Sequence, residues 1–196
     1  MDKTERLNAH MATVPDGYRT DPESHLQWGR DNFHYEWTVE HLRAHNAKHV
    51  LDIGVWDGWL DFLLVKAGFT LEGTEIDPAL CRAAETYARE NEVQYKIHQG
   101  FLDDIVLDSK FDAVVCYEVL EHVAWEDVPR MIAKMHSLAP LLLIAVPDQD
   151  HMLNQPQHLW TPTREKIDLL FPGAAVEHYF FNGIPPNWLI SHEWYS

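Results

Sequence analysis

The stretch His49–Gly68, HVLDIGVWDGWLDFLLVKAG, decides the fold of this chain. It opens with a short apolar strand, passes through a turn that contains Gly54 and Gly58, and becomes helical from Trp59. Apolar residues then recur at the i, i+3, i+4 and i+7 spacing of a helix, as Leu60, Leu63, Leu64 and Ala67. Glycine lets a backbone approach a ligand closely, and a helix N-terminus offers unpaired N–H groups. The stretch therefore predicts the first strand–turn–helix unit of a nucleotide-binding α/β sheet.

A second unit follows at the spacing that such a sheet requires. The predicted strand Thr70–Glu75 ends in a carboxylate about 20 residues after the turn, where an acid accepts ribose hydroxyls. Asp77-Pro78 then begins another helix, with proline at its first position. A dinucleotide-binding turn would have the pattern Gly-x-Gly-x-x-Gly, which this turn lacks, although the Glu75 spacing alone leaves a dinucleotide open.

Three motifs at this joint spacing resemble those of the class I S-adenosylmethionine-dependent methyltransferases. They are Asp52-x-Gly54-x-x-x-Gly58, Glu75-Ile-Asp-Pro and FDAVVCYEVLEHV at 111–123, and the resemblance covers residues 47 to 170. It implies that the turn binds the methionine end of S-adenosylmethionine, that Glu75 binds the ribose and that residues 101–102 sandwich the adenine. The predicted cofactor-binding residues are Asp52, Gly54, Trp56, Gly58, Glu75, Ile76, Phe101, Leu102 and Tyr117. For Phe101 and Leu102, core packing is the alternative.

The turn departs from the family pattern at Trp56, which occupies the position of the middle glycine. We interpret it as a variant whose indole points away from the cofactor or forms a wall of its site. The alternative is a non-catalytic S-adenosylmethionine-binding or interaction protein that keeps the fold.

The remaining periodicities complete an α/β fold. Further strands are expected at 94–98, 111–117, 141–146, 175–181 and 188–194, with helices at 31–46, 79–91, within 124–138 and at 163–171. No crossover helix fits between the last two strands, which should therefore be antiparallel neighbours. We predict a Rossmann-like, doubly wound, seven-stranded sheet, mostly parallel with an antiparallel C-terminal strand pair. Residues 1–46 would form an arm and helix that cover the pocket, and residues 47–196 the methyltransferase domain.

Composition limits the partners. Acidic residues outnumber basic ones 31 to 15, which gives a formal charge of -16 and disfavours extended binding to nucleic acid. The longest apolar run, Leu138–Pro147, is about half the length of a membrane-spanning helix. No apolar segment follows Met1, so we expect a cytoplasmic protein without a signal peptide. The two cysteines are expected to pack as small apolar groups.

Glu118, Glu121 and His122 follow the predicted central strand directly. If a helix begins there, their i, i+3 and i+4 spacing places them on one face, at the carboxyl end of the sheet where ligands bind. Two carboxylates and an imidazole so close together favour a positive partner, which could be a divalent cation, a substrate cation or protonated His122.

With the later His158, this constellation resembles two groups of metal-using O-methyltransferases. They are the small-RNA 3′-terminal 2′-O-methyltransferases and the ubiquinone-biosynthesis O-methyltransferases. The resemblance implies that Glu118, Glu121, His122 and His158 bind Mg²⁺ or Mn²⁺, which would lower the pKa of the attacking hydroxyl. Without a metal, His122 or His158 is the predicted general base. The sequence thus predicts O-methylation of a small molecule, a sugar or a nucleotide hydroxyl.

Overall fold

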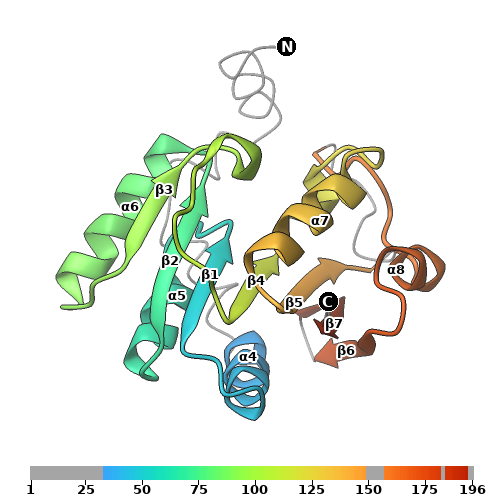
Figure 1. Cartoon of the computed structure of the whole chain (residues 1–196), viewed down its shortest axis with the longest axis horizontal. Coiled ribbons are helices and arrows are strands. Elements are labelled where there is room, and N and C mark those ends of the chain that lie inside the picture. Colours follow the sequence, from blue (N-terminus) through green and yellow to red (C-terminus); the bar gives the residue numbers. More distant parts are fainter. Residues whose placement is uncertain (1–32, 149–156, 182–183, 194–196) are drawn as a thin grey trace. The chain divides into compact units, whose positions relative to one another are not determined.

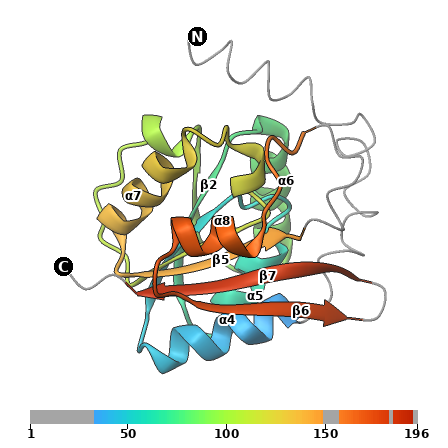
Figure 2. The ribbon, with the colours of Figure 1, turned by 90° about the vertical axis from the view of Figure 1, so that its right-hand side faces the viewer.

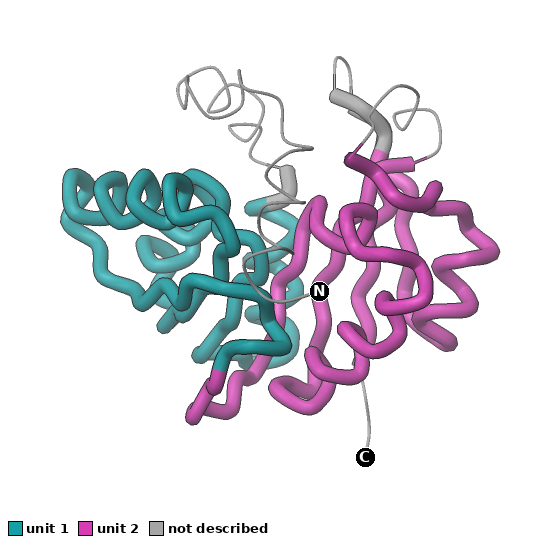
Figure 3. Tube along the Cα trace, turned by 90° about the horizontal axis from the view of Figure 1, so that it is seen from above, with its two compact units in different colours: residues 1–105 teal, residues 106–196 magenta. Residues whose placement is uncertain are grey.

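The computed structural model describes residues 33–148, 157–181 and 184–193, in two compact units that Figure 3 shows in different colours. The first unit comprises residues 1–105 and the second residues 106–196. The predicted N-terminal helix is present as α4 (Phe33–Ala44). The rest of the predicted arm lies outside the described residues, so its covering role remains a prediction.

Three parallel strands form the sheet of the first unit, in the order β3-β2-β1 (Figure 1). They are β1 (His49–Ile53), β2 (Thr70–Glu75) and β3 (Lys96–Gln99). Every residue of β1 after His49 is buried, as expected for a parallel strand that is covered on both faces. The glycine turn and Glu75 therefore both follow the carboxyl ends of neighbouring strands.

Helices α5 (Trp59–Lys66) and α6 (Pro78–Glu90) pack on these strands and on each other. Helix α6 begins at the predicted proline, and the side chain of Asp77 caps it by accepting the N–H of Ala79 at 2.7 Å. Its buried residues Cys81, Ala84 and Ala88 share one face, as the helical period predicts.

The second unit contains a four-stranded sheet in the order β4-β5-β7-β6. Its strands are β4 (Ala113–Tyr117), β5 (Leu141–Pro147), β6 (Ala175–Phe181) and β7 (Ile184–Glu193). Strands β4 and β5 are parallel, whereas β7 runs antiparallel to both β5 and β6. Figure 2 shows the long β6–β7 hairpin beside β5.

Helices α7 (Val128–Leu138) and α8 (Arg164–Leu170) belong to this unit, and so does the short 3₁₀ helix η2 (Leu120–His122). Helix α7 buries Val128, Ile132, Met135 and Leu138, and it has a proline in its first turn as predicted. The other 3₁₀ helix, η1 (Leu102–Asp104), follows β3 in the first unit.

The predicted fold class is confirmed: the seven strands have the order β3-β2-β1-β4-β5-β7-β6, with the antiparallel pair at the C-terminus. Several strand predictions had wrong limits: β4 begins at Ala113 and not at residue 111, β5 ends one residue later than predicted, and β3 and β7 differ as follows. Strand β3 begins at Lys96 because a turn with Glu92 at φ 56° leaves Gln94 and Tyr95 unpaired. Strand β7 begins at Ile184, because the predicted loop before Trp188 is part of the hairpin.

Both cysteines are free and buried, as predicted. None of the described helices combines the length and apolar character that crossing a bilayer requires.

Candidate functional site

The glycine turn, residues 54–58, joins β1 to α5 beside the end of β2. The amide of Gly54 donates to the carbonyl of Thr74 at 2.9 Å. Three residues of the turn have positive φ angles: Gly54 at 89°, Trp56 at 54° and Gly58 at 81°. The left-handed conformation costs an L residue about 1–2 kcal/mol. Neighbouring groups must therefore hold Trp56 in a conformation that a glycine would adopt freely.

The carboxylate of Glu75 stabilises this conformation. Its Oε2 accepts the backbone N–H of Trp56 at 3.1 Å, and its Oε1 accepts that of Asp77 at 2.8 Å. Glu75 is 6% exposed, and this burial raises its pKa while the backbone donors oppose the shift. A carboxylate has about four acceptor positions, so Glu75 retains capacity for the predicted ribose hydroxyls.

Gly58 is required for steric as well as conformational reasons. A Cβ atom at this position would collide with the hydroxyl of Tyr95 and lie 3.0 Å from Cβ of Ala84. Because α6 and the segment before β3 both press on the turn, any side chain here would displace the start of α5.

The predicted adenine segment reaches the same end of the sheet. The amide of Gly100 donates to the carbonyl of Glu75 at 2.9 Å, so Phe101 and Leu102 directly follow a contact with the residue that is predicted to bind the ribose. Phe101 is half-buried and Leu102 is buried. The structure thus brings the predicted ribose and adenine residues together within one unit.

The other predicted cofactor residues lie at the ends of strands. Asp52 is buried near the end of β1, at 3% exposure, and Ile76 is half-buried directly after β2. Tyr117 is half-buried at the end of β4, in the second unit. The roles of all three in cofactor binding remain predictions.

The chain does not become helical directly after Tyr117, contrary to the sequence prediction. Glu118 has a φ angle of 54°, and η2 begins only at Leu120. Glu118 is consequently not on the face of η2: its Oε1 accepts a hydrogen bond from Nδ2 of Asn187 in β7 at 3.0 Å. The predicted i, i+3 and i+4 face therefore does not form.

Glu121, His122 and His158 do come together, and we call them the acid–histidine cluster. One possible ligand atom from each lies within 4.8 Å of the others. The rings of His122 and His158 meet edge to face, with centroids 4.9 Å apart. Nε2 of His122 lies 3.8 Å from Oε1 of Glu121, which is beyond hydrogen-bonding distance.

The buried acid of the cluster carries an electrostatic cost. Glu121 is 0% exposed, and neither of its carboxylate oxygens has a hydrogen-bond partner among the described residues. Burial raises its pKa well above the usual range, and the negative charge of Glu118 adds to the shift. A buried carboxylate in this state favours either a proton or a cation.

His122 has a defined tautomer in its neutral form. Its Nδ1 lies 3.2 Å from the carbonyl oxygen of Gln157, and a carbonyl can only accept a hydrogen bond. Nδ1 therefore carries the proton, and Nε2 presents its lone pair toward Glu121. This is the form in which an imidazole acts as a base or as a metal ligand.

Two further hydrogen bonds attach the segment around His158 to η2. The amide of Leu159 donates to the carbonyl of Glu121 at 2.7 Å, and the indole Nε1 of Trp160 donates to the carbonyl of Leu120 at 2.8 Å. Residues on both sides of His158 are thus held against η2, so the position of His158 is set by the backbone as well as by its own packing.

An aromatic and cationic group, which we call the tryptophan clamp, packs around this attachment. It consists of Trp125, Trp160 and Lys166. The two indoles lie 5.0 Å apart, and Nζ of Lys166 stands 5.3 and 5.6 Å from their ring centroids. The same Nζ donates to the carbonyl of Thr161 at 2.9 Å. The clamp connects α8 to the loop after η2.

Sequence reasoning missed several residues around these groups. They are Asp61, Trp125, Trp160, Asn187 and the pair Asp148–His178, whose Oδ2 and Nε2 are 2.9 Å apart. The sequence gives no local indication of a role for Asn187, Asp148 and His178, because each contacts a residue that is distant in the chain and comes close only on folding. Asp61 did carry one, since it is an acid within the otherwise apolar run of α5.

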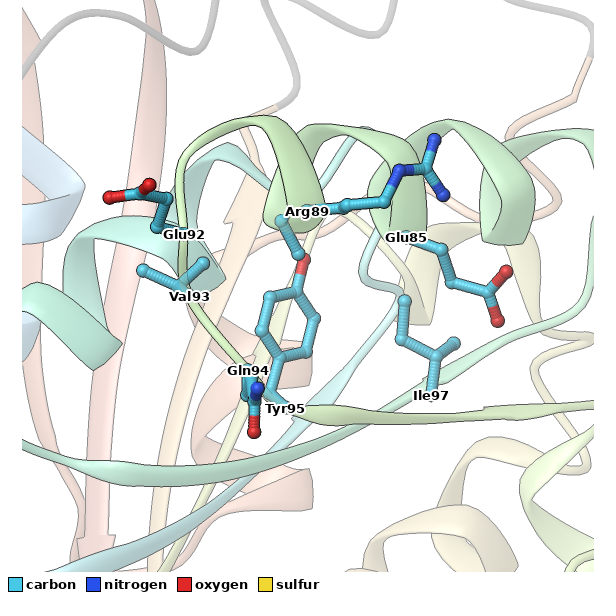
Figure 4. Close-up of a pocket in the computed structure, with 8 residues that line it drawn as sticks. Glu85, Arg89, Glu92, Val93, Gln94, Tyr95 and Ile97 are labelled. Atoms are coloured by element: carbon cyan, nitrogen blue, oxygen red, sulfur yellow. The ribbon is translucent and has the colours of Figure 1, made fainter.

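A groove of about 590 Å³ lies elsewhere in the first unit, between α6 and β3 (Figure 4). Its lining includes Glu85, Arg89, Glu92 and Tyr95, but none of the residues predicted to bind cofactor or metal. In Figure 4 the hydroxyl of Tyr95 points from the groove toward α6.

Comparison with known proteins places these features in a family. Residues 50–139 match the family model described as "Methyltransferase domain". A ubiquinone biosynthesis O-methyltransferase of Rickettsia akari (strain Hartford) is 29% identical over 115 residues, which are 51% of this chain and 46% of that protein. The chain spans about half the length of this relative and of several others that it matches.

Two solved structures share the fold. Magnesium protoporphyrin IX methyltransferase from Synechocystis PCC 6803, with bound S-adenosylmethionine, has a TM-score of 0.74 and 18% identity, covering 99% of this chain and 98% of its own. The methyltransferase domain of bacterial CtHen1 has a TM-score of 0.67 and 17% identity, covering 84% of this chain and 99% of its own.

Proposed function

Because this chain belongs to the class I S-adenosylmethionine-dependent methyltransferases, we propose that it transfers the methyl group of S-adenosylmethionine to a hydroxyl oxygen. The acceptor would be a small molecule, a sugar or a nucleotide. The observation that carries the choice of oxygen is the convergence of the buried Glu121 with His122 and His158.

The first unit would bind the cofactor. Its Glu75 would accept the ribose hydroxyls, the glycine turn would receive the methionine end, and Phe101 with Leu102 would contact the adenine. Trp56 does not argue against this role, because its backbone has the left-handed conformation that glycine has at this point of the turn. The non-catalytic alternative therefore loses its main support.

The transfer itself would be an in-line displacement. The acceptor oxygen forms a bond to the methyl carbon, the carbon–sulfur bond breaks, and its electron pair leaves with sulfur as S-adenosylhomocysteine. Since the sulfonium already activates the methyl group, the protein has to position the reactants and remove the hydroxyl proton. The lone pair on Nε2 of His122 fits that second task.

The acid–histidine cluster also fits a divalent cation. Its donors are one buried carboxylate without a hydrogen-bond partner and two imidazoles, a set that suits Mn²⁺ or Zn²⁺, and Mg²⁺ less well. Glu121, His122 and His158 would hold the ion, whereas Glu118 is committed to Asn187. When bound, such an ion supplies a Lewis acid that lowers the pKa of the acceptor hydroxyl.

The charge of the chain favours a compact acceptor. A net charge of -16 repels long polyanions, so a nucleoside, a sugar or a small hydroxylated molecule fits better than extended RNA. The Rickettsia relative is an O-methyltransferase, which supports oxygen as the receiving atom.

The test is a transfer assay with S-adenosylmethionine labelled in its methyl group, against catechols, sugars and nucleosides. We expect His122→Ala to lower the rate by about 10²–10⁴-fold, the usual contribution of a general base. Binding of S-adenosylhomocysteine, measured by calorimetry, should not change. The matched control is His45→Ala, at an exposed histidine that directly follows α4. Cofactor binding without transfer to any acceptor would instead support the non-catalytic alternative.

The metal is tested separately by titrating Mn²⁺ and following its electron paramagnetic resonance signal. We expect wild-type protein to bind one ion and Glu121→Gln to lose that binding. Full transfer activity in excess chelator would reject the metal and leave His122 or His158 as a simple base.

A further inference from the structure

An acidic residue lies on the buried face of α5, the helix that follows the glycine turn. Asp61 is 0% exposed and shares this face with Leu64, although the sequence period predicts only leucines and alanine there. Among the described residues, no N–H or hydroxyl group is placed to donate to either of its carboxylate oxygens. A buried acid without a donor is unfavourable in its charged form.

The partner of Asp61 is a second buried acid, Asp52 of β1. Asp52 is 3% exposed, its backbone carbonyl lies beside the same point of β2 as the Asp61 carboxyl, and each acid shifts the pKa of the other. The Asp61 carboxyl is directed at the β1–β2 pair, since its Oδ1 lies 3.5 Å from where a Cβ of Gly73 would stand. Two ionised carboxylates can only accept hydrogen bonds. A hydrogen bond between Asp52 and Asp61 therefore requires that one of the two is protonated.

The pair has no compensating positive charge among the residues that the structure describes. Neither acid forms an ion pair with a lysine, arginine or histidine of the described residues. The titratable groups that act on the pair are Glu75 from β2, Asp57 from the turn and Tyr95 from the segment before β3. Burial keeps the pKa of Tyr95 above its usual range, so this hydroxyl stays neutral.

The titration behaviour agrees with this geometry. Burial raises the pKa of Asp52 to about 7, and burial together with the charge of Asp52 raises that of Asp61 well above the usual range. Two acids that share one site cannot both ionise at neutral pH, as in other carboxyl dyads.

We propose that Asp52 and Asp61 share one proton, and that Asp61 thereby positions Asp52 and the glycine turn for S-adenosylmethionine. The second part rests on the proposed function, whereas the first part does not. Asp61 is a positioning residue: it acts on the cofactor through Asp52, which ends the strand that leads into the turn.

The sign of the pH effect follows from the shared proton. The folded state binds a proton that the unfolded chain, whose aspartates titrate near pH 4, has already released. The stabilisation is therefore complete below about pH 4 and is lost progressively as the pH rises from there through the folded-state pKa of Asp52, about 7. Loss of the proton leaves two buried charges beneath the turn, so cofactor affinity should fall over the same range.

The experiment compares wild-type protein with Asp61→Asn between about pH 5 and about pH 9, a range that includes the folded-state pKa of Asp52. Asparagine has nearly the same size and donates an N–H to Asp52 without titrating. In the wild type we expect a fall in Tm of about 2–4 °C or more. We also expect the Kd for S-adenosylhomocysteine to rise by up to about tenfold per pH unit. In Asp61→Asn both slopes should flatten.

The matched control is Glu90→Gln, which removes the same charge from an exposed position at the end of α6. Its slopes should follow the wild type, because only general repulsion changes. Identical slopes in wild type and Asp61→Asn would overturn the proposal.

A second measurement covers the case in which Asp61→Asn does not fold. Wild-type protein labelled only in its aspartate carboxyl carbons should show two coupled NMR resonances that titrate near neutral pH. If every aspartate of the folded protein titrates near pH 4, no proton is shared. A protein with these resonances but without affinity for S-adenosylhomocysteine would retain the shared proton and refute the proposed function instead.

Discussion

Trp56 shows how a single residue can break a sequence rule and still keep the structure. A bulky side chain at a glycine position suggests a lost binding site, yet its φ angle of 54° is glycine-like and its N–H is held by Glu75. We therefore expect the carboxylate of Glu75 to have two functions at once. It fixes the backbone of the turn, and it remains available to a ligand.

Replacement of Glu75 tests this double function. Glu75→Ala should weaken binding of S-adenosylhomocysteine by about 1.5–3 kcal/mol, the range for hydrogen bonds to charged groups. It should also lower the free energy of unfolding, because the N–H groups of Trp56 and Asp77 lose their acceptor. Calorimetry measures the first effect and urea unfolding the second. Unchanged affinity in a folded variant would remove Glu75 from the cofactor site.

At the scale of elements, most of the fold followed from periodicity and spacing. The limits of β2 and β6 agree with the prediction, because turn and helix-start signals bound β2 and glycine-containing turns bound β6. The prediction failed where the chain depends on a partner that is distant in sequence. The helix predicted after Tyr117 is replaced by the left-handed Glu118 and the short η2, whose attachment to residues 157–160 no local pattern encodes.

The candidate site shows the same limit. The motif residues of the first unit were identifiable, since strand ends and a glycine turn have local signatures. The grouping of Glu121 and His122 with His158 followed from a family resemblance, and only the structure separates Glu118 from them. The tryptophan clamp had no signature in the sequence, because the contact between the tilted rings of Trp125 and Trp160 forms only in the folded chain.

The clamp gives a prediction at this scale. Trp160→Phe keeps an aromatic ring but removes the donor to the carbonyl of Leu120, which should cost about 1–3 kcal/mol of unfolding free energy. Because the segment around His158 loses one of its attachments, Mn²⁺ affinity should fall as well. Urea unfolding and a metal titration measure the two effects.

The control is Trp125→Phe, at a position whose described contacts are with the ring of Trp160 and the amine of Lys166. It should affect both quantities less. If Trp125→Phe has the larger effect on both, aromatic packing rather than the hydrogen bond positions His158.

At the scale of the whole molecule, we expect stability against acid to depend in part on a pair of histidines outside the candidate site. Nε2 of His136 in α7 lies 3.1 Å from Nδ1 of His192 in β7. Burial lowers the pKa of His136 to about 4, and the neighbouring His192 adds to this shift. Burial also lowers the pKa of His192.

Both histidines are thus less basic in the fold than in the unfolded chain, so their contribution is complete above about pH 6.5 and is lost as the pH falls toward 4. We expect His136→Gln to flatten the fall in Tm between pH 6.5 and 4.5. His45→Gln, at an exposed position, should leave it unchanged. Parallel curves for wild type and His136→Gln would show that this pair does not govern acid unfolding.

The attachment of Trp160 to Leu120 spans 40 positions of the chain, and the intervening residues include all of α7 and β5. Closing a loop of that length has an entropic cost that only a completed fold offsets. We therefore expect Glu121 and His122 to meet His158 late in folding, after the strands between them have paired. An ion or acceptor that needs all three residues would bind the native chain alone. By mass action, a higher concentration of that ligand would lower the fraction of unfolded chain and so slow degradation of the protein.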